Sequence, residues 1–233
     1  MARISLDGST GGRRVNTERR RRRGRGVTAE RVGDERGEGP GGAFARALAA
    51  IDAANAADPT LLETPTGPRP KELVHAELLT AWVRRLRPDA SEALLLAARA
   101  HHLRRWTVPR GTYPAGRQGY LRWRRDLHAF HADEAARLLA EVGYDAALCA
   151  RVGQIVRKER LSQDPEVQTL EDGLCLVFLE LQLDELTDRV ADEAKMVDVL
   201  RKSWRKMSPA GREVALGLEL SDAGLALVRR ALG

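Results

Sequence analysis

Apolar residues recur with helical spacing through almost the whole chain from residue 43 onward. In the stretch KELVHAELLTAWVRRL, residues 71–86, they return every three or four positions and therefore share one face of an α-helix. No segment shows the apolar–polar alternation of a half-buried strand, so the pattern predicts an all-α protein. The same spacing predicts further helices over residues 43–57, 90–106, 120–142, 145–160 and 191–207, and helices that begin at Asp164, Ser208 and Ser221.

Residues typical of helix ends delimit several of these segments. Asp164 and Ser208 each precede a proline, the combination expected of an N-cap and a first helical position. Asp89 with Glu92 three residues later is typical of a capping box for the helix from residue 90. Gly143 suits the position just after a helix. The four prolines between residues 59 and 70 predict a connector.

Charge divides the chain unevenly. Residues 1–42 hold 11 arginines against 6 acidic residues, whereas residues 43–233 hold 28 basic against 27 acidic residues. The first segment is rich in Gly and Arg and poor in apolar residues, so we predict a disordered basic tail whose Arg19–Arg23 run could bind RNA or an acidic partner. We predict that residues 43–233 form a single all-helical domain.

Other features limit the class of protein. The chain has no apolar run near 18 residues and no apolar core for a secretory signal, which predicts a soluble cytoplasmic protein. Its two cysteines, Cys149 and Cys175, lie in apolar helical segments and are expected to be small buried thiols. Nothing in the sequence indicates an oligomeric state.

The five histidines fall on or beside predicted inward faces. His75 adjoins the apolar stripe of its helix, His101 lies near the middle of the next apolar face, and His102 lies on its flank. His128 and His131 are three residues apart on one helix, so their imidazoles share a face. Five histidines directed at one core indicate either a metal or catalytic centre or a polar network that only holds helices together.

Two acidic residues fall in the most apolar helix. VQTLEDGLCLVFLEL is apolar nearly all round and is expected to be the central helix, with Glu171 and Asp172 in its second turn. A buried carboxylate requires a cation, a metal or hydrogen-bond donors. Histidine and carboxylate ligands suit a divalent ion such as Zn, Mn, Fe or Ni.

The segment from residue 99 to residue 125 is strongly basic. It contains eight arginines and no acidic residue, interleaved with aromatic side chains. Arginine binds phosphate with a planar fork and aromatic rings stack on bases, so the segment predicts a pocket for a phosphorylated small molecule or nucleotide, or a module that binds RNA or a nucleotide without chemistry. The alternative is a solvated basic face paired with acids elsewhere. The predicted substrate-binding residues are Arg104, Arg105, Arg110, Trp106 and Tyr113.

Several long stretches resemble one helical family, catalogued as domain of unknown function four-two-zero-two. They include RPKELVHAELLTAWVRRL, HHLRRWTVPRGTYP, GYLRWRRDLHAFHADEAARLL and VRKERLSQDPEVQTLEDGLCLVFLE. The resemblance extends from residue 43 to about residue 220. It implies an all-helical protein and supplies no activity.

A second pattern is similar to the HD-domain metal phosphohydrolases. The order His75, AARAHHL, HADEAARLLAEVGYDAALCARVGQIV and LEDGLCL carries this similarity. It implies an HD-like helical architecture and a metal held by His75, His101, His131 and Asp172. The chain departs from the pattern where His102 replaces the Asp of the His-Asp pair. Two interpretations follow: an altered metal site with His102 as a ligand, or a pocket that is inactive.

The resulting hypothesis is a metal-dependent hydrolase in which the ion activates a water molecule. Glu171 or His128 would then be the proton carrier. A structural interaction domain, with histidines that bind no metal, is the non-catalytic alternative.

Overall fold

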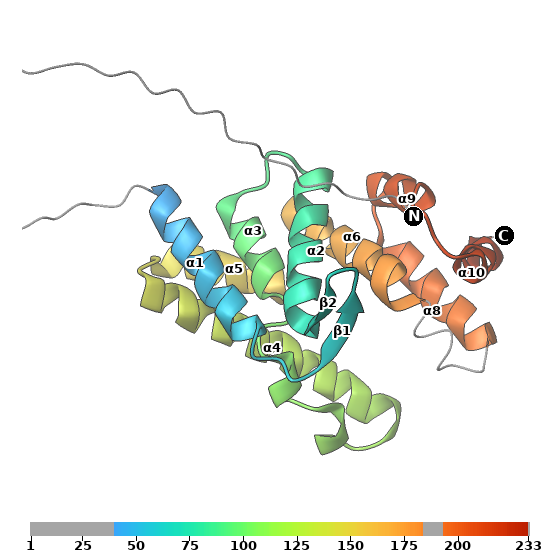
Figure 1. Cartoon of the computed structure of the whole chain (residues 1–233), viewed down its shortest axis with the longest axis horizontal. Helices are drawn as coiled ribbons and strands as arrows, with labels where there is room; N and C mark the ends of the chain where they lie inside the picture. The colour runs from blue at the N-terminus through green and yellow to red at the C-terminus, as the bar shows by residue number, and fades with distance from the viewer. Residues whose placement is uncertain (1–39, 184–192, 233) are drawn as a thin grey trace, which may run out of the picture. The chain divides into compact units, whose positions relative to one another are not determined.

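The computed structural model describes residues 40–183 and 193–232, which are mostly helical (Figure 1). These residues belong to one unit, Glu38–Gly233. The all-α prediction is confirmed. The elements are α1 (Pro40–Asn55), β1 (Leu61–Thr64), β2 (Gly67–Pro70), α2 (Lys71–Leu86), α3 (Glu92–Ala100), η1 (Arg105–Thr107), η2 (Arg110–Thr112), α4 (Gly116–Val142), α5 (Ala146–Val156), α6 (Pro165–Val177), the π-helical η3 (Phe178–Gln182), α8 (Glu193–Lys206), α9 (Pro209–Leu216) and α10 (Asp222–Leu232).

Most helix ends lie where the capping residues predict. The Asp164 side chain accepts from the N–H groups at the start of α6, and Ser208 does the same for α9. Gly143 ends α4 with φ 103°, a conformation that glycine adopts without strain. The predicted capping box at Asp89 is wrong, because Ser91 is the N-cap of α3 and accepts from the Leu94 N–H.

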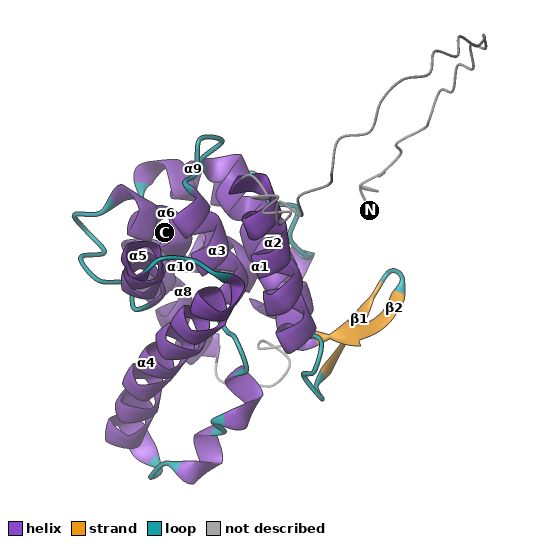
Figure 2. Ribbon diagram, turned by 90° about the vertical axis from the view of Figure 1, so that its left-hand side faces the viewer, coloured by secondary structure: helices purple, strands orange, loops and turns teal. Residues whose placement is uncertain are grey.

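The proline-rich connector contains a short β-hairpin that the sequence pattern missed. Strands β1 and β2 pair antiparallel, with Leu61 opposite Pro70 and Thr64 opposite Gly67, and Figure 2 shows the hairpin beside the start of α2. Proline is tolerated here because each strand of a two-stranded ribbon has a free edge. Gly67 has φ 104°, which the tight turn requires.

The helix predicted to run as far as Trp106 ends earlier. α3 stops at Ala100, and His101 and His102 lie in the turn that follows. Arg104 adopts the left-handed conformation, with φ 54°, where the chain leaves this turn for η1. The two histidines therefore lie in a turn at the end of a buried helix, rather than on the helix itself.

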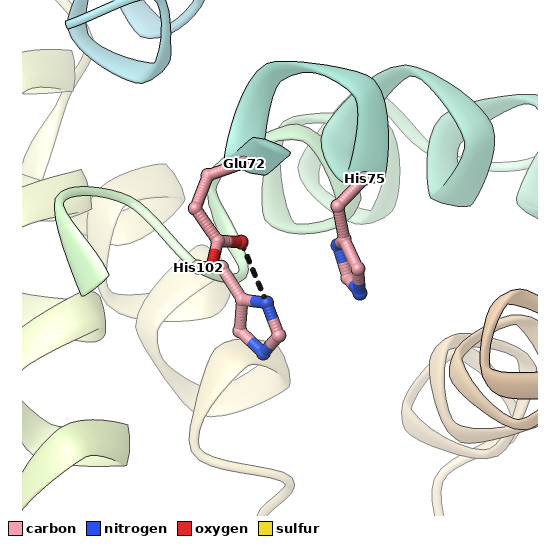
Figure 3. A group of neighbouring side chains, drawn as sticks. All are labelled: Glu72, His75 and His102. Atoms are coloured by element: carbon pink, nitrogen blue, oxygen red, sulfur yellow. Dashed lines mark hydrogen bonds and ion pairs between the residues drawn. The ribbon is translucent and has the colours of Figure 1, made fainter. Parts of the chain in front are cut away.

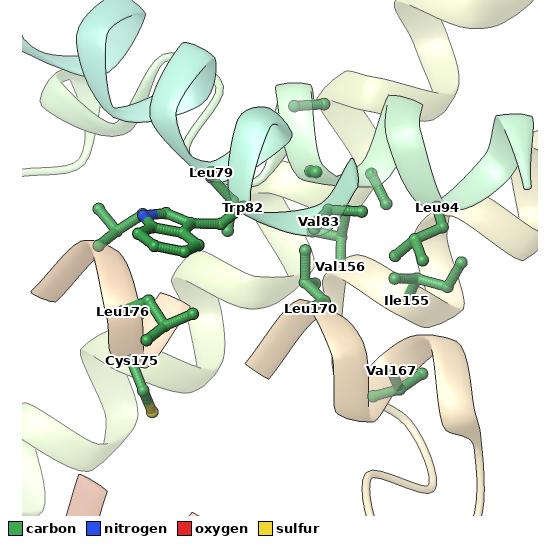
Figure 4. Close-up of a cluster of buried hydrophobic side chains, with 14 of the residues drawn as sticks. Leu79, Trp82, Val83, Leu94, Ile155, Val156, Val167, Leu170, Cys175 and Leu176 are labelled. Atoms are coloured by element: carbon green, nitrogen blue, oxygen red, sulfur yellow. The ribbon is translucent and has the colours of Figure 1, made fainter. Parts of the chain in front are cut away.

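Helix α6 lies at the centre of the hydrophobic core, as its apolar sequence predicts. It packs against α2, α3, α5, α8 and α9, and Figure 4 shows its side chains among those of α2, α3 and α5. Gly173 permits α6 to pack closely against α2, because a Cβ there would lie 3.0 Å from Leu79 Cδ1. Leu170 and Leu176 are fully buried. Cys149 and Cys175 are both buried and unbridged, as expected.

Two further expectations concern regions at the limits of the structure. The predicted basic tail is residues 1–42, and residues 1–39, with the Arg19–Arg23 run, lie outside the described part of the chain. The last three residues of the predicted tail belong to α1, which begins at Pro40. Among the helices described, none has the length and apolar character needed to cross a bilayer.

Candidate metal centre

All five histidines of the chain line one cavity of about 400 Å³. They come from α2, from the turn after α3, and from α4. His75, His101 and His131 are almost fully buried, with 4%, 4% and 1% of their surface exposed. The structure thus brings together the imidazoles that the sequence places on separate helices. The cavity also receives side chains from α6, α8 and the turn after α5.

Three side chains at or beside this cavity could hold a metal ion. Glu72, His75 and His102 each offer one ligand atom, and these atoms lie within 4.8 Å of one another. Figure 3 shows Glu72 and His75 descending from the same helix, α2, with the His102 ring between them and a hydrogen bond joining it to Glu72. A tetrahedral ion with ligands about 2.1 Å away holds them about 3.4 Å apart, so binding draws these atoms closer.

Glu72 is positioned by the start of its helix. It lies in the first turn of α2, and its backbone N–H donates to the Asp58 carboxylate at 3.0 Å. Its own carboxylate is 6% exposed and accepts from His102 Nδ1 at 3.0 Å. Because an ionised carboxylate can only accept, Nδ1 of His102 carries the proton and Nε2 keeps a lone pair. The carboxylate fixes the orientation of the ring, but while it accepts from Nδ1 it cannot also ligate an ion bound at Nε2, which points away from it.

His131 is held in the same manner by a backbone carbonyl. Its Nδ1 donates to the Leu103 carbonyl at 2.9 Å, which ties α4 to the turn after α3. Its Nε2 is buried and, within the described part of the chain, has no hydrogen-bond partner; the same is true of His101 Nδ1. Buried polar atoms are rarely left unpaired, so these two nitrogens are places where a ligand or metal would be expected to bind.

The rings lie close enough to act as one cluster. His75 stacks on His102 with ring centroids 4.3 Å apart, and the His101 and His131 centroids lie 4.8 Å and 5.8 Å from that of His102. Burial lowers the pKa of His75, His128 and His131 to about 4, and it lowers the pKa of His101 and His102 as well. The imidazoles are therefore neutral at pH 7, the form that binds metals.

Glu171 also lines the cavity, but it is already paired. It is 3% exposed, and its two carboxylate oxygens face Lys158 Nζ at 2.5 Å and Lys206 Nζ at 3.5 Å. Burial alone would raise the pKa of Glu171, but the two lysines outweigh burial and the pKa is lowered. Glu171 is therefore a carboxylate at neutral pH, held between two ammonium groups.

Asp172, expected to be a metal ligand, has a different role. Its carboxylate accepts from the Ser208 N–H at 2.8 Å, from the Ser208 hydroxyl at 2.6 Å and from Gln168 Nε2 at 3.0 Å. Asp172 is absent from the cavity lining and instead joins α6 to the start of α9. Consecutive residues on a helix point about 100° apart, so Glu171 faces the cavity and Asp172 faces α9.

Of the five residues predicted to bind substrate, only Arg105 lines the cavity. Its guanidinium stacks on the Trp123 ring at 4.9 Å and lies 3.8 Å from the Glu72 carboxylate. Arg104 pairs with Glu134 at 2.7 Å, and Arg110 donates to backbone carbonyls of its own loop. Trp106 and Tyr113 are half-buried outside the lining. The Arg104–Glu134 pair fits the alternative prediction for this segment, a solvated basic face paired with acidic residues elsewhere.

Comparison with known protein families assigns the chain to one family. Residues 45–228 match the model of the family described as domain of unknown function (DUF4202). The chain belongs to this family. The match confirms the first of the two resemblances, and the description of DUF4202 names no activity. No curated protein and no solved structure matches the chain significantly.

Sequence reasoning missed three residues at the site of this DUF4202 protein. Glu72 lies three residues before His75 on one helix, and that spacing, which places both on one face, is the signal that could have found it. An acidic residue in a first helical turn also has an ordinary explanation in the helix dipole. Lys158 and Lys206 lie at or beyond the ends of α5 and α8, where helical periodicity does not predict direction.

Proposed function

We propose that the protein is a divalent-metal-dependent hydrolase of a phosphorylated small molecule or nucleotide. The observation that carries the proposal is the convergence of all five histidines on one cavity, with Glu72, His75 and His102 close enough to share an ion. A cavity of about 400 Å³ is within the size range of small-molecule sites.

In this proposal Glu72, His75 and His102 hold the ion, which would be Zn, Mn, Fe or Ni. The unpaired nitrogens of His101 and His131 are the further donors available to the ion or to its ligands. The bound ion would supply a polarised water molecule as nucleophile and would stabilise charge on the phosphoryl oxygens. The Glu72–His102 hydrogen bond orients that ring before the ion arrives. For both residues to become ligands, the ion would replace the proton on His102 Nδ1, because Nε2 points away from Glu72.

His128 is the proposed proton carrier. It lines the cavity beside His101, with ring centroids 6.5 Å apart. Burial lowers its pKa to about 4, so it is neutral at pH 7, and a bound phosphate would have to raise that pKa for it to act as an efficient base. Glu171, the other candidate, is engaged by Lys158 and Lys206, so it would serve as a base only when those pairs open. Arg105 is positioned to contact an anionic substrate in the same cavity.

The test separates metal binding from turnover. Metal content is measured on the purified protein, and hydrolysis of p-nitrophenyl phosphate and of nucleoside 5′-monophosphates is assayed with added Mn or Ni. We expect His102→Ala to lose both bound metal and hydrolysis, and His128→Ala to retain the metal while hydrolysis falls by about 100-fold or more. His128→Ala is the matched control because it removes a cavity imidazole outside the triad. Absence of both bound metal and metal-stimulated hydrolysis in the wild-type protein would refute the proposal.

A further inference from the structure

Four cationic side chains converge on the cavity from four separate segments. Arg105 comes from η1, Arg124 from α4, Lys158 from the turn after α5, and Lys206 from the last position of α8. Glu171 is the one carboxylate among the lining residues that the structure describes. Even with Glu72, which lies 3.8 Å from Arg105, counted beside Glu171, the four cations outnumber the carboxylates by two. Like charges around one cavity repel, and a bound anion would relieve that repulsion.

The two lysines are held together by one buried carboxylate. Lys158 Nζ contacts one oxygen of Glu171 and Lys206 Nζ contacts the other, so the two ammonium groups lie on either side of the same group. The Lys158 side chain is 13% exposed and that of Lys206 is 48% exposed. Each ammonium has three donors, and Glu171 occupies one donor of each. Among the residues that the structure describes, Glu171 is the acceptor that both ammonium groups contact, so their remaining donors can bind an acceptor in the cavity.

The backbone around Lys158 is unusual for a residue with a side chain. Lys158 has φ 58°, in the left-handed region, which is strained for a residue other than glycine. Its N–H donates to the Ile155 carbonyl at 3.0 Å, so the conformation closes the end of α5. Lys206 is fixed too, because its carbonyl accepts from Gln168 Nε2 at 2.8 Å. Both lysines are thus anchored at the backbone before any ligand binds.

We propose that Lys158 and Lys206, positioned by Glu171, form an anion subsite that binds the phosphate group of the ligand. The subsite is separate from the Glu72, His75 and His102 cluster and does not require a metal. It rests on the proposed function only for the identity of the natural ligand, since inorganic phosphate is itself a probe of the subsite. Arg124 completes the basic wall, and its guanidinium donates to the Tyr120 hydroxyl at 3.5 Å.

The test is calorimetric titration of chelator-treated, full-length protein with inorganic phosphate, and in a second arm with a nucleoside monophosphate and the matching nucleoside. We expect phosphate and the nucleotide to bind and the nucleoside to bind at least tenfold more weakly. Lys206→Gln should weaken phosphate binding about tenfold or more, because a charge-assisted hydrogen bond is lost. Lys202→Gln is the matched control, since Lys202 lies on the same helix, pairs with Asp198 and is absent from the lining.

A second variant guards against misfolding. Lys158→Met alone would leave Glu171 buried with one partner fewer, so the double change Lys158→Met with Glu171→Gln removes both charges together. We expect this variant to fold and to bind phosphate about tenfold more weakly. Equal weakening by Lys206→Gln and Lys202→Gln, or no phosphate binding by the wild-type protein, would overturn the subsite. Metal content is measured separately, so a failure of the phosphate subsite would not contradict the proposed metal centre. Conversely, a protein that binds phosphate but no metal would contradict the metal centre and support the subsite.

Discussion

Acid should destabilise the metal-free protein well above the pH at which its carboxylates titrate. His75 and His131 are 4% and 1% exposed, and burial lowers the pKa of each to about 4, against about 6.5 in an unfolded chain. Below pH 6.5 the unfolded state therefore binds protons that the folded state does not. Stability is fully present above pH 6.5 and is lost progressively as the pH falls toward 4.

The magnitude follows from the two pKa values of each imidazole. Between pH 7 and pH 5, one histidine with these values costs about 2 kcal/mol, and His75 and His131 together cost about 4 kcal/mol. That is a large part of the 5–15 kcal/mol typical of a folded domain. Glu72 acts in the opposite direction, since burial raises its pKa and protonation then favours the folded state as the pH falls. The pKa of Asp164 is lowered to about 2, chiefly by Arg151, so its contribution is lost only below about pH 4.

Urea unfolding at pH 7, 6 and 5 in the presence of a chelator measures this directly. The His131→Asn variant is the internal comparison: whatever its stability at pH 7, its loss between pH 7 and pH 5 should be smaller than that of the wild type by about 2 kcal/mol. A wild-type loss below about 1 kcal/mol, or an identical pH dependence in the variant, would show that the imidazoles are not held neutral by burial.

Four substitutions test other parts of the structure. Asp172→Ala should lower the free energy of unfolding by about 2–4 kcal/mol by removing the acceptor for Ser208, with metal content unchanged; loss of metal at unchanged stability would contradict this. Glu72→Gln should weaken metal affinity about 10–100-fold in a chelator competition, and unchanged affinity would remove Glu72 from the centre. Ser91→Ala should cost about 1 kcal/mol in urea unfolding and Asp89→Ala less than about 0.5 kcal/mol; the reverse order would restore Asp89 as the cap.

The helices were predictable because each buries one face, and burial imposes the spacing that the sequence displays. Caps were predictable where one residue type has one role, as at Asp164 and Ser208. The hairpin over residues 61–70 was not, because its two four-residue strands are too short for an alternating pattern and the second strand contains two prolines. The early end of α3 was also hidden, since the arginines after it are as compatible with a helix as with a turn.

The convergence of the histidines was predictable from the faces they occupy, but their polar partners were not. Spacing shows that Glu171 and Asp172 lie on a buried helix, yet it does not show which of them meets the cavity and which meets α9. That choice depends on how α6 is rotated relative to its neighbours, a property of the whole packing. The direction of the Lys158 side chain depends on a left-handed backbone conformation, which cannot be predicted from the residue type because lysine rarely adopts it.

The pairing of Glu72 with His102 shows why a local motif is a poor guide to this site. The HD-domain pattern would place a carboxylate directly after the second histidine, where this chain has His102. Here a carboxylate is instead supplied from α2, one turn from His75, and it meets His102 at 3.0 Å across two elements. The carboxylate and the imidazole lie 30 residues apart in the chain. Their meeting depends on the register between α2 and the turn after α3, so a shift of either element would separate the pair while leaving every local sequence feature intact.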